Sequence, residues 1–284
     1  MALRGKGVLV LAADAIALGD DLGGFDHNEQ TFRVLTSLER RYAEFDGLNL
    51  TWEMLEGLAK HNGPLRRPSP YIADYDRLHP LDLTTHASAE AQVAAIADDI
   101  AYDNHDIDDG IRAGLLTLEQ LLEMPFVARR WDMIRTNYPD VPERRLIGEL
   151  TRSQIGWMVN DVIEATRVRI AQNHIETATD VRSAAEALGG FSEEVAAQER
   201  TLKKFMYANL YHHAEQLEAA LRARKIVTEL FASYREDAAL LPQEWRDSLP
   251  VDEPGHSRHI ADFLAGMTDR YAMNRHREIY GAVS

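Results

Sequence analysis

The residues best suited to chemistry lie between Ser88 and Gly114, where acids, a tyrosine and a histidine follow helical spacing. At about 100° per residue, Asp98, Tyr102 and His105 fall on one border of an apolar stripe. The other border carries three further acids, which are Asp99, Asp103 and Asp106. Carboxylate oxygens suit Mg²⁺ or Mn²⁺, and carboxylates with imidazoles suit Mn²⁺, Fe²⁺ or Zn²⁺. The pattern indicates a metal or phosphate site, and the alternative interpretation is a solvated acidic face of a helix.

The apolar stripe predicts how this segment is placed in the fold. Its members recur at three- and four-residue steps and are Val93, Ile96, Ala97, Ile100 and Ala101. Such spacing is typical of a helix that buries one face. We therefore expect residues 88–109 to form a largely helical segment that is central in the fold.

The composition is that of a soluble globular protein with an acidic surface. The 284 residues include 46 acidic and 31 basic side chains, which gives a formal net charge of −15. This excess of acid opposes strong nucleic-acid binding, because that binding rests on cationic contacts to phosphate. The absence of cysteine excludes disulfides and thiolate zinc sites, and it fits a cytoplasmic protein. No apolar run reaches the ~20 residues of a membrane-spanning helix, and Asp14 interrupts the short run that would suggest a signal peptide.

Helical periodicity dominates the rest of the chain. One apolar face runs through residues 30–45, and a second helix is expected over 51–61, where Asn62-Gly63-Pro64 stops it. Repeated prolines predict a loop over 64–83. Further helices are expected over 117–137, 143–173, 194–234 and 257–280. Because no strand pattern appears beyond the short run Val8–Leu11, the sequence predicts an all-α fold.

Five segments, in order along the chain, resemble one family. They are the 88–114 segment and four others, which are GGFDHNEQ at 23–30, FDGLNLTWEMLEGLAKHNGP at 45–64, LKKFMYANLY at 202–211 and IADFLAGMTDRYA at 260–272. All are similar to deoxynucleoside triphosphate triphosphohydrolases of the HD superfamily, in the dGTP triphosphohydrolase-like branch. The resemblance implies an HD-domain-like helical bundle that is truncated at its N-terminus relative to the family. It also implies a single domain over 1–284, with a partial HD core in 1–130 and a C-terminal helical part in 131–284.

The resemblance also implies a metal site. The family holds its metal with an early His, an adjacent His-Asp pair and a late Asp. Asp98 matches the late Asp and Asp21 matches the Asp of the pair, whereas Asp20 stands where the pair has its His. The early His and the catalytic loop that follows the pair are absent from this sequence. The implied cofactor is a divalent metal held by Asp98 and Asp21, with Mg²⁺ or Mn²⁺ first and Fe²⁺, Co²⁺ or Zn²⁺ as alternatives. Together with the apolar stripe, the resemblance implies that Asp98 faces an interior cleft shared with Asp21 or His27, and that Asp99 points elsewhere.

The segment GGFDHN matches the family's Phe-[Asp/Glu]-His-Asn motif, which lies next to the active site. The match implies a catalytic role for His27, together with Asp98, and a substrate contact for Asn28. A helix N-terminus also favours anions. The alternative interpretation is that His27 and Asn28 cap and pack the start of a helix.

A second group of substrate residues lies late in the chain. By family placement Lys203 or Lys204 would contact the triphosphate, and Tyr207 would stack on a base or sugar. Lysines beside core aromatics are also common on ordinary surfaces, which is the alternative interpretation. Asp269 would line the substrate pocket for the same reason, or else pair with Arg270 on the surface of a helix.

The implied reaction is hydrolysis of dGTP or another deoxynucleoside triphosphate to the deoxynucleoside and tripolyphosphate. Family members assemble into oligomers, so a homo-oligomer is expected, with no membrane partner. Because Asp20 replaces a histidine and a catalytic loop is absent, we expect this chain alone to turn over slowly or not at all. The rival interpretation is a non-catalytic helical protein that binds nucleotide or assembles with intact homologues.

Overall fold

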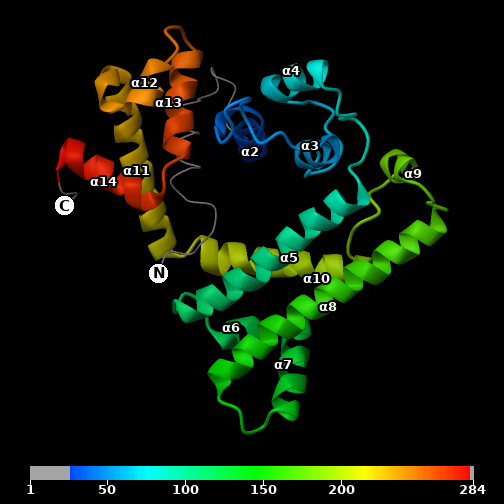
Figure 1. Ribbon diagram of the computed structural model, residues 1–284. Coiled ribbons are helices and arrows are strands. Elements are labelled where there is room, and N and C mark those ends of the chain that lie inside the picture. The colour runs from blue at the N-terminus through cyan, green and yellow to red at the C-terminus, as the bar shows by residue number, and fades with distance from the viewer. Residues whose placement is uncertain (1–25, 282–284) are drawn as a thin grey trace. The chain divides into compact units, whose positions relative to one another are not determined.

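The chain is all-helical, as the sequence predicts (Figure 1). The computed structural model describes residues 26–281, and this part contains no strand. It divides into two compact units, one of residues 28–211 and one of residues 26–27 with 212–281. No helix in the described range is long and apolar enough to cross a membrane. The expected division of a single domain at residue 130 stays a prediction.

The first unit is an assembly of helices around α5 (Figure 1). From the start of the described chain, the elements are α2 (His27–Arg33), η2 (Val34–Leu38), α3 (Trp52–Ala59), α4 (Pro70–Leu78), α5 (Ala89–Arg112), α6 (Leu118–Leu122), α7 (Pro125–Asn137), α8 (Glu143–Gln172), α9 (Ala178–Ser183), α10 (Glu193–Met206) and η3 (Tyr207–Tyr211). Helix α5 packs along α8 and also contacts α3 and α10. Ile100 of α5 forms a small core with Met158 and Val162 of α8. The α5 segment is therefore helical and central, which confirms that part of the prediction.

The sequence of α5 explains where the helix begins and which face it buries. Ser88 caps the helix, because its hydroxyl accepts the N–H of Ala91 at 3.2 Å. The buried residues are Ile100, Asp103, Asn104, Ile107 and Gly110. Val93 and Ala97, expected on the buried stripe, are instead exposed. The covered face is rotated from the predicted stripe, so Asp103 lies within it rather than on its border.

The helix expected over 30–45 ends early, because α2 passes into the five-residue π-helix η2 and the chain then turns. Gly47, at φ 76°, completes the turn, and its N–H donates to the carbonyl of Glu39 at 2.7 Å. An L side chain rarely adopts this backbone conformation, so glycine suits the position. Tyr42 and Phe45, expected on the buried helical face, are therefore exposed in the turn.

The proline-rich segment 64–83, expected to be a loop, contains helix α4. Ser69 caps this helix, and Pro70 takes its first position, where the N–H that proline lacks would have no helical partner. Tyr75 of α4 then meets Phe32 edge-on, with ring centroids 5.0 Å apart. The same proline that suggested a loop thus starts a helix.

The other expected helical ranges are confirmed with short interruptions. The range 117–137 is divided into α6 and α7, and 143–173 is the single long helix α8. The range 194–234 is interrupted after η3, where the side chain of His213 caps the next helix. The range 257–280 is divided after Ala265.

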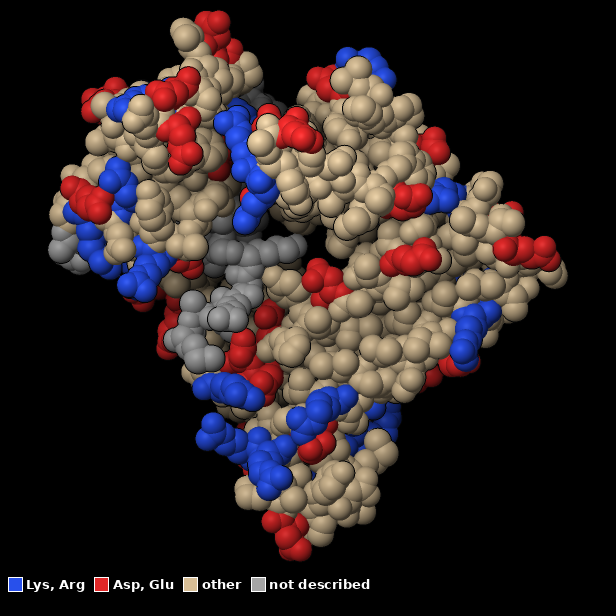
Figure 2. Space-filling view, in the orientation of Figure 1, with Lys and Arg blue, Asp and Glu red and all other residues tan. Residues whose placement is uncertain are grey.

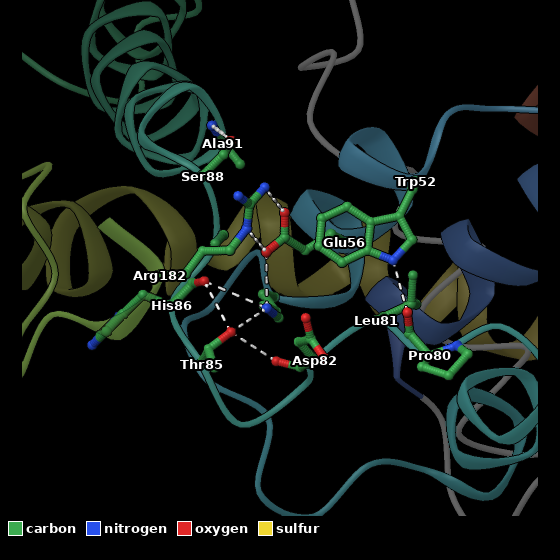
Figure 3. Close-up of polar contacts among 12 residues, drawn as sticks. Trp52, Glu56, Pro80, Leu81, Asp82, Thr85, His86, Ser88, Ala91 and Arg182 are labelled. Carbon is green, nitrogen blue, oxygen red and sulfur yellow. Dashed lines mark hydrogen bonds and ion pairs between the residues drawn. The ribbon is translucent and has the colours of Figure 1, made fainter. Parts of the chain in front are cut away.

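A buried ion-pair network ties α3 to α9 and to the chain around Thr85 (Figure 3). Glu56 and Lys60 have side chains with no exposed surface, and they pair at 2.9 Å. Arg182 of α9 donates to both carboxylate oxygens of Glu56 at 2.7 and 2.8 Å. Burial favours the neutral acid, but the hydrogen bonds from Arg182 and Lys60 outweigh it and hold the pKa of Glu56 below 4.5. The spacing of the sequence does not point to Arg182, which lies 126 residues from Glu56.

The second unit is built on α11. Its helices are α11 (Ala214–Glu236), η4 (Ala238–Leu240), α12 (Gln243–Asp247), α13 (Gly255–Ala265) and α14 (Asp269–Tyr280). Helix α11 packs against both α13 and α14. The shared core includes Leu230, Tyr234 and Ile260, none of which has exposed surface. Buried His276 of α14 adds a polar contact to Glu229 of α11 at 2.6 Å.

Candidate functional site

Helix α10 contacts α5 (Figure 1). Lys203 of α10 reaches the acids of α5, since it pairs with Asp99. Asp161 of α8 fixes the start of α10, because its carboxylate accepts the N–H and the hydroxyl of Ser192 at 2.8 and 2.7 Å. The hydroxyl of Ser192 in turn caps α10. The facing side chains form the α5–α10 site, which consists of Asp99, Asp103, Asp106, Glu199, Lys203, Tyr207 and Tyr211.

Lys203 supplies the positive charge of the α5–α10 site. Its ammonium group pairs with Glu199 one turn earlier and with Asp99 at 3.5 Å. Burial lowers the pKa of Lys203, but the hydrogen bond to Glu199 and the charges of Asp103 and Asp99 outweigh it and raise the pKa overall. Lys203 is therefore protonated and positively charged at neutral pH. Its partial exposure leaves room for contact with an anion.

Asp103 is the most deeply buried acid of the α5–α10 site. Its exposed fraction is only 5%. Its Oδ2 has no hydrogen-bond partner in the described part of the chain. Burial raises the pKa of Asp103 to about 7 despite the opposing charge of Lys203, and the acids Glu199, Asp99 and Asp106 add to the rise. At neutral pH this carboxyl is thus poised between its charged and neutral forms.

The two tyrosines of the site come from η3, a single π-helical turn, which is a feature often found at functional sites. The hydroxyl of Tyr211 donates to Asp106 Oδ2 at 2.5 Å. Burial and this hydrogen bond raise the pKa of Tyr211, so it stays a neutral phenol. Burial also raises the pKa of Asp106, although the hydrogen bond from Tyr211 opposes the rise. The ring of Tyr207 meets Tyr211 edge-on and is 60% exposed, so it can meet an incoming ring.

Asp98, the proposed metal ligand, is on the exposed side of α5 and not in the α5–α10 site. Asp21 and Asp20 lie outside the described residues. His27 is exposed at the start of α2 and is grouped with the second unit. The cleft expected between Asp98 and Asp21 or His27 therefore stays a prediction. Within residues 26–281 no three His, Cys, Asp or Glu side chains converge as a metal site would require.

The remaining predicted substrate residues lie in different places. Asn28 is partly buried in α2, and Lys204 is exposed on α10 beside Lys203. Asp269 is the first residue of α14 in the second unit, where a negative charge favours a helix N-terminus. Of the predicted substrate residues, the structure thus brings Lys203 to the acids of α5, and it places Tyr207 against Tyr211, which bonds Asp106. The roles of Asn28, Lys204 and Asp269 stay predictions.

Comparison with known proteins gives the family. Residues 189–278 match the model of a phosphohydrolase-associated domain. A "Deoxyguanosinetriphosphate triphosphohydrolase-like protein" of Rhizobium meliloti (strain 1021) is 48% identical over 269 residues, which are 91% of this chain and 66% of that protein. A protein of the same name from Brucella ovis is 48% identical over 271 residues, which are 92% of this chain and 67% of that protein. This chain belongs to the dGTP triphosphohydrolase-like family.

Membership of the dGTP triphosphohydrolase-like family confirms the resemblance drawn from the five sequence segments. The chain spans about two thirds of the length of the curated relatives it matches. The phosphohydrolase-associated match includes α10, η3 and the helices of the second unit. It therefore covers Lys203, Tyr207 and Tyr211, which form one side of the α5–α10 site.

Two members of the site, Glu199 and Asp103, differ from what the sequence predicted. Glu199 stands four residues before Lys203, which is the spacing of a helical ion pair, so a signal was present. Asp103 was placed on the border of the stripe, and only the packing of α5 shows that it is buried. Together, the site offers a lysine for an anion, an exposed ring for stacking and a carboxyl that exchanges protons near neutral pH.

Proposed function

We propose that this protein acts on a deoxynucleoside triphosphate, with dGTP as the first candidate, and releases the deoxynucleoside and tripolyphosphate. The observation that carries the proposal is 48% identity over 92% of the chain to a relative named a deoxyguanosinetriphosphate triphosphohydrolase-like protein. The phosphohydrolase-associated match supports the broader class of phosphohydrolases.

In this proposal the α5–α10 site binds the substrate through its own side chains. Lys203 contacts the triphosphate, and Tyr207 stacks on the base or sugar. Water adds to the phosphorus nearest the sugar, the bond to the 5′ oxygen breaks, and that oxygen takes up a proton. Asp103 has a pKa of about 7, so it can hold or release a proton beside Lys203 near neutral pH.

We also propose that Asp98 and Asp21 hold a divalent cation, Mg²⁺ or Mn²⁺, with Fe²⁺, Co²⁺ or Zn²⁺ as alternatives. Such a cation polarises a phosphoryl oxygen when bound. The described residues do not form this site by themselves, since Asp98 is their single proposed ligand. His27 is proposed as a catalytic neighbour, and Asn28, Lys204 and Asp269 as further substrate contacts.

The test is the release of deoxyguanosine and tripolyphosphate from dGTP by the purified chain with Mg²⁺ or Mn²⁺. We expect turnover well below that of the Brucella ovis relative, because Asp20 stands in the place of a histidine ligand. Asp98→Ala should abolish the turnover that remains. Glu90→Ala, which changes another exposed acid of α5, should leave it unchanged. Activity that survives Asp98→Ala contradicts the role given to Asp98.

The alternative proposal is a protein that binds nucleotide without hydrolysis or assembles with intact homologues. The observation in its favour is the lack of a convergent metal-ligand set within residues 26–281. Metal content after dialysis distinguishes the two proposals, since only the first requires a retained divalent cation. Under either proposal we expect a homo-oligomer, and the lack of cysteine favours the cytoplasm.

A further inference from the structure

A cavity of about 320 Å³ lies between α7, α8 and α10. It shares no lining residue with the α5–α10 site, although α10 contributes to both. Phe126 and Met133 give the cavity an apolar part, and Arg129, Arg130 and Trp157 give it a basic and aromatic part. This size is near the lower end for pockets that hold small molecules.

The α7 wall carries positive charge that no carboxylate of the described residues pairs with. The guanidinium of Arg130 lies 4.3 Å from the centroid of the Trp157 ring, and its Nε–H is buried with no hydrogen-bond partner among residues 26–281. Burial, aided by the charge of Arg129, lowers the pKa of Arg130. The environment therefore disfavours the charged form of this guanidinium. Neither arginine forms an ion pair with any described residue. Two adjacent guanidinium groups without a carboxylate are suited to a phosphate.

The surroundings of the cavity have the same sign of charge. Figure 2 shows Lys and Arg side chains gathered over the end of the first unit that holds α6, α7 and the start of α8. Residues 125–152 contain six arginines and four acids, whereas the whole chain has a formal net charge of −15. A local excess of positive charge in an acidic protein favours the approach of an anion.

The α10 wall of the cavity carries hydrogen-bond acceptors and a carboxylate, so it requires donors from a ligand. Gln198 donates its amide to Glu194 at 3.1 Å, and its own Oε1 is buried without a donor in the described part of the chain. Both residues line the cavity, so this wall offers acceptors and a carboxylate. Buried polar atoms are rarely left without a partner in native proteins. A bare anion would suit only the arginines, whereas a ligand with N–H or O–H groups would suit both walls.

We propose that this cavity binds a small phosphorylated ligand that also carries N–H or O–H donors, such as a nucleoside monophosphate. The phosphate contacts Arg129 and Arg130, the donors face Glu194 and Gln198, and the apolar part of the ligand lies along Phe126 and Met133. This binding does not depend on the function proposed for the α5–α10 site.

The test is calorimetric titration of the full chain with AMP, adenosine and inorganic phosphate. AMP should bind at least tenfold more tightly than either fragment, because only AMP meets both walls. Arg129→Gln and Arg130→Gln should each weaken AMP at least tenfold. Arg167→Gln, which changes an exposed arginine of α8 outside the cavity, should leave AMP affinity unchanged. Equal binding of adenosine and AMP would overturn the proposal, as would equal binding of phosphate and AMP.

Two further variants distinguish AMP binding in this cavity from AMP binding at the α5–α10 site, and from a loss of binding caused by misfolding. Lys203→Gln should leave AMP affinity unchanged, and loss of binding in Lys203→Gln with retention in Arg130→Gln would overturn the proposal. Arg130→Lys keeps the charge but loses the planar stack on Trp157, so its AMP affinity should be intermediate. If Arg130→Gln loses its helical circular dichroism, the exposed Arg129→Gln decides the outcome, and unchanged AMP binding in that variant counts against the proposal.

Discussion

Removing the carboxylate of Glu56 should be among the most destabilising single changes in the first unit. The side chains of Glu56 and Lys60 have no exposed surface, and Arg182 is 19% exposed. In Glu56→Gln, Arg182 can turn toward water, but the ammonium of Lys60 stays buried. Its remaining partners are the Thr85 hydroxyl at 2.8 Å and the His86 carbonyl at 3.4 Å, and both are neutral. Leaving one charge of a buried pair without its partner costs about 3–5 kcal/mol.

The assay is urea unfolding followed by circular dichroism at pH 7. The matched control is Glu164→Gln, because Glu164 and Arg167 form an exposed pair on α8, and such pairs contribute about 0–1 kcal/mol. The double variant Glu56→Gln/Lys60→Met removes the stranded charge and should recover part of the loss. A loss below about 1 kcal/mol for Glu56→Gln would falsify the view that Lys60 is held by this carboxylate.

The pH dependence of unfolding gives a second measurement on the same network. The pKa of Glu56 is lowered in the folded protein from 4.5. The stabilisation is therefore fully present above pH 4.5 and is lost as the pH falls through the lower, folded-state pKa. The difference in unfolding free energy between wild type and Glu56→Gln should shrink over this acid range. A difference that stays constant there would show that Glu56 is not an ionised partner.

Other residues give further expectations. Asp103→Asn should stabilise the protein at pH 8, since it removes a buried carboxylate whose charged form is disfavoured by burial. Because the folded pKa of Asp103 is raised from 3.8 to about 7, wild type should lose stability relative to Asp103→Asn as pH rises between these values, and parallel curves from urea unfolding would contradict this. Leu230→Ala should cost about 2–5 kcal/mol in thermal unfolding, and a loss below about 1 kcal/mol would show that this core is loosely packed. Light scattering should give a mass above the 32.1 kDa monomer, and a clean monomer would refute self-association.

The helices were predictable because their signals are local. The long helix α8 and the cap of α5 at Ser88 follow from periodicity and from a serine at the right position. The secondary-structure predictions were wrong where the same residue or spacing is compatible with two kinds of local structure. Pro70 begins a helix as readily as it marks a loop. The apolar spacing of residues 30–45 suggested a longer helix, whereas the helical segment ends at Leu38.

The candidate site was predictable only in part, because burial depends on distant packing. The spacing of α5 placed Asp98 and Asp103 on opposite borders of one stripe. The packing of α8 and α10 decides which acid is covered, and it covers Asp103. The Glu56 network shows the same limit, since Arg182 reaches it from a helix far along the chain. Sequence spacing therefore identified the helix that carries the candidate site, and tertiary contacts decided which of its acids has a perturbed pKa.

The charge balance of the α5–α10 site sets a condition on any phosphate chemistry there. The site holds one ammonium, that of Lys203, and four carboxyl groups, those of Asp99, Asp103, Asp106 and Glu199. A triphosphate adds several more negative charges, and like charges at short range repel strongly where water is scarce. Protonation of Asp103 near pH 7 removes one negative charge, but the acids still outnumber the lysine. Binding of a triphosphate at this site therefore requires added positive charge, which is the physical reason to include a divalent cation in the proposal.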